Sequence, residues 1–164
     1  MAMNDLTNIK ARPLAKTASE ECSAALWRRL TSANLTWADA VRDLAVDEGI
    51  RGELEAAAVQ LRRHAEPCGG HWIAATLAPL LTLYGVPDKG EREAKAFFGF
   101  YIDALGDLPR EAVTLGVAEY VADAKSEFFP KPGPLKAICD RHAIPLRMAA
   151  NRARKALELA GRAV

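Results

Sequence analysis

Two pairs of cysteine and histidine in the sequence have the spacing of zinc ligands. Cys68 is followed three residues later by His71, and Cys139 in the same way by His142. Two thiolates and two imidazoles make a tetrahedral zinc site when a fold brings them together. Cys139 and His142, however, share an expected helix face with apolar neighbours, where a packed thiol and a hydrogen-bonded imidazole also belong. We therefore expect no metal and no other cofactor.

The common arrangements of catalytic side chains are missing from the sequence. It contains no Gly-x-Ser-x-Gly turn, no glycine-rich phosphate loop that ends in Lys-Ser or Lys-Thr, and no His-Glu-x-x-His pair. Its paired carboxylates lie near expected helix ends, where acidic side chains stabilise the first turn. We expect a protein that is not an enzyme and binds no small molecule.

Basic residues are concentrated toward the C-terminus. Residues 128–164 hold 8 Lys and Arg against 2 Asp and Glu, whereas residues 1–127 hold 14 against 19. A last helix is expected from Pro145 to about Arg162, with a narrow Ala and Leu stripe and four candidate contact residues, Arg147, Arg152, Arg154 and Lys155. Such a surface suits nucleic-acid phosphates or an acidic protein, and it could equally pair with the acidic part of the chain itself.

Two adjacent phenylalanines, Phe128 and Phe129, precede the proline-rich run Pro-Lys-Pro-Gly-Pro. Three prolines so close together predict a non-helical break at 128–134. Exposed aromatic rings are typical hot spots of protein interfaces, so both phenylalanines are candidate partner-binding residues. The alternative is that both rings fold back as a plug between the helices on either side.

Helical periodicity accounts for most of the remaining chain. The clearest apolar face has its residues three and four positions apart: Ala94, Phe97, Phe98, Tyr101, Ile102 and Leu105. With Val117, Tyr120 and Val121 of the next helix, this face is expected to form a buried core. Thr17-x-x-Glu20 and Thr36-x-x-Asp39 can each cap a helix, and Gly49 can end one in the left-handed conformation.

These patterns predict an all-α fold, a compact bundle of about seven helices without a sheet. A flexible arm is expected at 1–16 and a single helical domain at 17–162, with an N-terminal layer at 17–84 and a C-terminal layer at 91–162. A short helix is expected at 135–142. No segment has the length of a membrane span or the pattern of a signal peptide, so we expect a cytoplasmic protein with reduced cysteines and no membrane partner.

About a quarter of the chain, roughly 94–135, resembles a known family. The shared features are Tyr101-Ile-Asp-Ala-Leu105, Asp107-Leu-Pro-Arg-Glu-Ala112, Val117-Ala-Glu-Tyr120 and Phe128-Phe-Pro-Lys-Pro-Gly-Pro-Leu135. The segment is similar to the non-ATPase replicative-helicase loaders of phages and prophages, which bind a replicative helicase and help place it on DNA.

The resemblance implies a non-catalytic DNA-replication accessory protein that acts by binding. Its expected partner is a replicative helicase or another host protein complex, and single-stranded DNA is a further candidate. Two other hypotheses stay open. One is a phage-encoded inhibitor of a host machine, of the anti-defence type, and the other is a structural or oligomeric helical protein.

Overall fold

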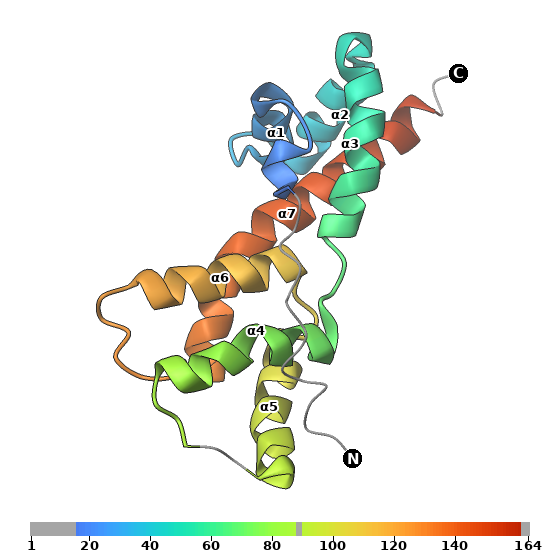
Figure 1. Ribbon diagram of the computed structural model, residues 1–164. Coiled ribbons are helices and arrows are strands. Elements are labelled where there is room, and N and C mark those ends of the chain that lie inside the picture. Colours follow the sequence, from blue (N-terminus) through green and yellow to red (C-terminus); the bar gives the residue numbers. More distant parts are fainter. Residues whose placement is uncertain (1–15, 88–89, 162–164) are drawn as a thin grey trace. The chain divides into compact units, whose positions relative to one another are not determined.

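The computed structural model describes residues 16–87 and 90–161, and within them the fold is all-α, as predicted (Figure 1). The helices of these residues are η2 (Ala18–Glu20), α1 (Ala24–Thr31), α2 (Trp37–Val46), η3 (Glu48–Ile50), α3 (Arg51–His64), α4 (Gly69–Leu83), α5 (Glu91–Leu105), α6 (Arg110–Ala122) and α7 (Pro132–Ala160), where η marks a 3-10 helix. Among these helices, none combines the length and the apolar character that crossing a membrane requires. The arm expected at 1–16 lies, except for Lys16, outside the described residues.

The chain forms two compact units. The first unit spans 67–143 and contains α4, α5, α6 and the beginning of α7. The second contains α1, α2, α3 and the remainder of α7. Helix α4 therefore groups with the helices that follow it in the chain, not with those that precede it. The single domain expected at 17–162 stays a prediction.

Side-chain caps begin helices α1 and α2 of the second unit. The Thr36 hydroxyl accepts a hydrogen bond from the Asp39 amide (3.2 Å) at the start of α2, as the sequence predicts. The capping box that begins at Thr17 is also present, but it opens the short helix η2. Helix α1 has its own cap, because the Ser23 hydroxyl accepts from the Leu26 amide (3.1 Å).

The predicted left-handed stop at Gly49 is wrong. Helix α2 already ends at Val46, and the extended backbone of Asp47 breaks it. The Asp47 carboxylate accepts the Gly49 amide (3.1 Å), which places Gly49 inside η3. Helix α2 thus ends at an aspartate that caps the following 3-10 helix, and not at the glycine.

The prolines of α7 also lie differently from expectation. Pro132 and Pro134 belong to the first turn of α7, so the non-helical break ends before 132 rather than at 134. The amides of a first turn have no partner within the helix, and prolines there sacrifice no hydrogen bond. Pro145, expected to open a separate helix, lies inside α7 instead. Its ring removes one backbone hydrogen bond, and the residues on both sides of it remain helical.

The core of the first unit is narrower than the sequence predicts. Tyr101 and Val117 are buried, but Phe97 is only half-buried and Val121 is 40% exposed. Phe98 and Tyr120 are half-buried as well. The buried face of α6 consists of Glu111, Ala112, Val113, Gly116 and Val117. Val121 lies near the end of α6, where the chain leaves for the loop, and packs less closely.

Helices α6 and α7 approach each other closely at Gly116. A Cβ added at this position would lie 2.5 Å from the Cys139 Sγ atom and 3.0 Å from the Cys139 Cα atom. Because one of these atoms is backbone, rotation of a side chain cannot relieve the overlap. Only a glycine at 116 allows this packing.

Replacing Gly116 with alanine should destabilise the protein by about 1–3 kcal/mol, the usual cost of overpacking a tight core. Gly99→Ala is the matched control, because Gly99 also lies in a helix and its added Cβ would meet no atom within 4 Å. The control should gain about 0.5–1 kcal/mol from higher helix propensity. Urea unfolding of both variants measures the difference, and equal effects would rule out the close approach.

Candidate partner-binding surface

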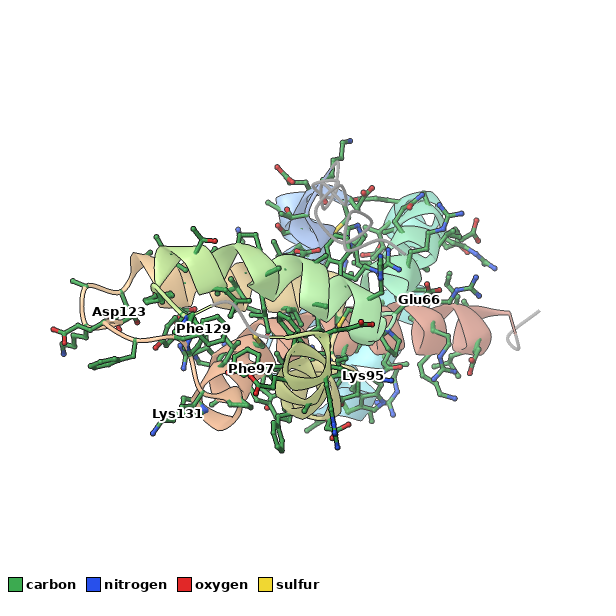
Figure 2. All side chains as sticks on the ribbon, turned by 60° about the horizontal axis from the view of Figure 1, so that its bottom comes forward. Glu66, Lys95, Phe97, Asp123, Phe129 and Lys131 are labelled. Carbon is green, nitrogen blue, oxygen red and sulfur yellow. The ribbon has the colours of Figure 1, made fainter. Side chains whose placement is uncertain are left out.

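Phe129 lies within a cluster of aromatic rings contributed by α5, by the residue directly after α4 and by the loop between α6 and α7. Its ring centroid is 5.3 Å from that of Phe97, 5.8 Å from Tyr101 and 6.3 Å from Tyr84. Figure 2 shows Phe129 on the loop, whose flanks are marked by Asp123 and Lys131. Tilted and edge-to-face rings at these separations attract each other beyond the area they bury. Phe129 therefore packs the loop against α5.

Two tyrosine hydroxyls hold the backbone of the same loop. Tyr101 donates to the Pro130 carbonyl oxygen (2.7 Å), and Tyr120 donates to the Phe128 carbonyl oxygen (2.9 Å). Burial raises the pKa of Tyr101, so its hydroxyl stays protonated and remains a donor. The backbone is thus bonded on both sides of Phe129.

The two candidate phenylalanines have opposite positions. Phe129 folds back into the aromatic cluster, which is the plug arrangement, whereas the Phe128 side chain is 76% exposed. The two neighbouring rings thus differ in their surroundings: one lies among other aromatic rings and the other faces outward. Of the two, only Phe128 is available to a partner.

On α7, the candidate contact residues Arg154 and Lys155 are both exposed. Each is paired with Glu158, one turn further along the helix, and the Lys155 Nζ atom lies 2.9 Å from a Glu158 carboxylate oxygen. The hydrogen bonds from Lys155 and Arg154 lower the pKa of Glu158. One carboxylate is thus shared by two cations, which leaves a net positive surface at this turn. Arg147 is half-buried, and Arg162 lies outside the described residues.

Arg152 does not belong to this exposed surface, because its side chain is only 3% exposed. Its Nη1 atom donates to the carbonyl oxygens of Ser32 (2.7 Å) and Leu30 (3.1 Å) at the end of α1. Its guanidinium also lies over the Trp37 ring, 5.6 Å from the centroid. A cation at a helix C-terminus satisfies carbonyls that the helix itself leaves free. Arg152 therefore holds the second unit together, and we leave it out of the binding surface.

The cysteines and histidines of the two candidate zinc pairs differ in burial and in their hydrogen-bond partners. Cys68 and Cys139 are buried, and burial raises the pKa of Cys139 to about 12, so this thiol stays protonated. His71 is exposed, whereas His142 is bonded to Glu119. Within 16–87 and 90–161, no three Cys, His, Asp or Glu side chains are grouped so that they could hold a metal ion.

A charged cluster that the sequence analysis did not identify joins α6 to α7. The Glu119 carboxylate accepts from the His142 Nε2 atom (2.7 Å) and from the Arg141 guanidinium. Both hydrogen bonds lower the pKa of Glu119, and the bond from His142 has the larger effect. Glu119 is separated from His142 by 23 residues, and no local spacing rule relates positions so far apart. Because the cluster is partly exposed and its side chains pair with one another, we interpret it as an ionic link between the two helices.

Comparisons with known proteins were made at three levels. No family model, no curated protein and no solved structure matches this chain.

Replacing Arg152 with methionine should lower the free energy of unfolding by about 2–4 kcal/mol, because it leaves buried carbonyls at the end of α1 without a donor. Arg154→Met is the matched control, since Arg154 is an exposed arginine on the same helix. The control should change stability by less than about 0.5 kcal/mol. Chemical denaturation of both variants measures the free energy of unfolding. An Arg152→Met variant as stable as wild type would contradict the structural role of Arg152.

Replacing Glu119 with glutamine should remove a pH-dependent contribution to stability. The folded-state pKa of Glu119 lies below its unfolded value of 4.5. Its stabilisation is therefore fully present above pH 4.5 and is lost as the pH falls through the folded pKa. Wild type should exceed the variant in Tm at pH 7, and the gap should close in acid. Glu127→Gln, at an exposed position for which the structure shows no ion pair, is the control. A gap that persists unchanged in acid would exclude the ionic link.

Proposed function

We propose that this chain is a phage-type DNA-replication accessory protein that acts by binding, similar to the non-ATPase helicase loaders. In this proposal it has no catalytic activity of its own. A replicative helicase is its partner, and single-stranded DNA is a secondary ligand. The proposed contact residues are Phe128 and the exposed cations of α7, Arg154 and Lys155.

One structural observation supports the proposal above the others. The residues that carry the resemblance to helicase loaders are the residues that hold 101–135 together. The Tyr101 hydroxyl donates a hydrogen bond to the Pro130 carbonyl, and the Tyr120 hydroxyl donates one to the Phe128 carbonyl. The Phe129 ring packs in the aromatic cluster. Leu105, Leu108 and Leu135 of the same motifs are fully buried. The motifs that carry the resemblance therefore belong to one packed region of the first unit. Next to it lies Phe128, an exposed aromatic ring of the kind that protein partners bind.

The proposal is tested with purified protein and a purified replicative helicase. The two should co-elute in size-exclusion chromatography, and the protein should increase the amount of helicase retained on single-stranded DNA. Absence of a helicase complex would contradict the loader reading. Co-elution with a host nuclease complex instead would favour the inhibitor hypothesis.

The second half of α7 supports the DNA part of the proposal through its charge. Each phosphate neutralised by a lysine or arginine releases condensed counterions, so binding weakens as salt increases. Glu158 competes for the two cations that would make these contacts. A phosphate that binds here must displace the carboxylate.

Reversing Arg154 and Lys155 to glutamate should flatten the log–log salt dependence of single-stranded DNA binding by about 1.4, at about 0.7 per lost contact. Glu158→Gln should have the opposite effect and strengthen binding at low salt, since it frees both cations. Fluorescence anisotropy with an oligonucleotide measures both slopes. If neither variant changes binding, α7 is not the DNA-contacting surface.

A further inference from the structure

The Phe128 side chain is exposed on a backbone that is fixed before any partner arrives. The Tyr120 hydroxyl holds the Phe128 carbonyl oxygen, and the next two residues, Phe129 and Pro130, are held by the aromatic cluster and by Tyr101. The loop before Phe128 is also bonded internally, because the Ser126 amide donates to the Asp123 carbonyl (2.9 Å). The backbone that carries this ring is therefore held in place by several bonds.

Pre-ordering matters because a partner then incurs less of the entropic cost of fixing the loop. Ordering a loop and its side chains on binding consumes free energy that would otherwise appear as affinity. A large ring on a restrained backbone has only its own two side-chain torsions to lose. Phe128 therefore has the properties of an interface hot spot while the protein is still free.

The charges around Phe128 indicate what kind of partner it fits. The exposed charged residues of the loop are Asp123, Lys125, Glu127 and Lys131, two of each sign. Figure 2 labels the first and the last of them. A phosphate backbone gains little from a surface without net charge. A protein interface typically has an apolar centre and a rim of mixed charge, which is the pattern here.

We propose that Phe128 is a pre-positioned docking residue that inserts into an apolar pocket of a protein partner, and that Tyr120 is its positioning residue. The identity of that partner as a replicative helicase rests on the proposed function. The basic turn of α7 is then left for DNA, so that two different surfaces serve the two ligands.

The central test compares two exposed phenylalanines of the same unit. Phe128→Ala should weaken helicase binding by about 30-fold or more, the effect expected of a hot-spot aromatic. Phe100→Ala is the control, because Phe100 is 68% exposed but lies on α5 and not on the restrained loop. The control should stay within about 2-fold of wild type. Both variants should bind single-stranded DNA as wild type does. Surface plasmon resonance with immobilised helicase gives both constants.

The role of Tyr120 is tested by a double-mutant cycle. Tyr120→Phe removes the hydroxyl that holds the Phe128 carbonyl and should weaken helicase binding about 3-fold, in line with the loss of one hydrogen bond. In the Phe128→Ala background the same change should have no further effect, because no ring remains to be positioned. A general structural role for Tyr120 would instead lower affinity equally in both backgrounds, and that result would overturn its assignment.

The outcomes separate this inference from the proposed function. If wild type binds the helicase and Phe128→Ala binds equally well, the docking role is wrong and the proposed function stands. If wild type forms no helicase complex, the proposed function fails, and the docking role assigned to Phe128 fails with it.

A change in oligomeric state on Phe128→Ala would identify a second copy of the chain as the occupant. A loss confined to DNA binding would identify a nucleic-acid contact. Either of these two results overturns the inference.

Discussion

The insertion of Phe129 among Tyr84, Phe97 and Tyr101 is the interaction on which the candidate surface depends. It connects the loop after α6 to aromatic residues that come much earlier in the chain, on α5 and directly after α4. With this ring inserted into the cluster, the neighbouring Phe128 faces outward and is 76% exposed. The two tyrosine hydroxyls then fix the backbone on either side, at Phe128 and Pro130.

This arrangement depends in turn on how closely α6 and α7 pack, because the loop spans the gap between them. Gly116 lets the backbone of α6 approach Cys139, and Glu119 links the same two helices through His142 and Arg141. A glycine contact and a charged link at neighbouring turns of α6 hold the ends of the loop at a set separation. The loop is therefore restrained at its ends as well as along its backbone.

Features governed by neighbours in sequence were predictable, and those governed by distant contacts were not. The all-α fold and the cap at Thr36 follow from local spacing, and both are confirmed. Gly49 and Pro145 were misjudged because a capping aspartate and the surrounding helix overrode their usual local preferences. The burial of Arg152 depends on carbonyls about 120 residues away in the chain, at Leu30 and Ser32. No pattern within the last helix distinguishes it from the exposed Arg154.

The same distinction applies to the candidate site. The sequence identifies Phe128 and Phe129 as a pair, but only the tertiary contacts show that one ring is used for packing and the other is exposed. The basic helix likewise divides into a buried arginine that stabilises the second unit and an exposed pair that shares Glu158. The surface left for a partner is smaller than the sequence suggests, and its two parts differ in charge.

The most direct test of this account is a photo-cross-link from the loop itself. A photoreactive phenylalanine analogue at position 128 should cross-link to the replicative helicase on irradiation, and the same analogue at position 100 should not. Mass spectrometry of the product should place the cross-link in an apolar pocket of the helicase. Cross-linking that is absent at 128, or equally strong at both positions, would contradict the claim that this ring is the docking residue.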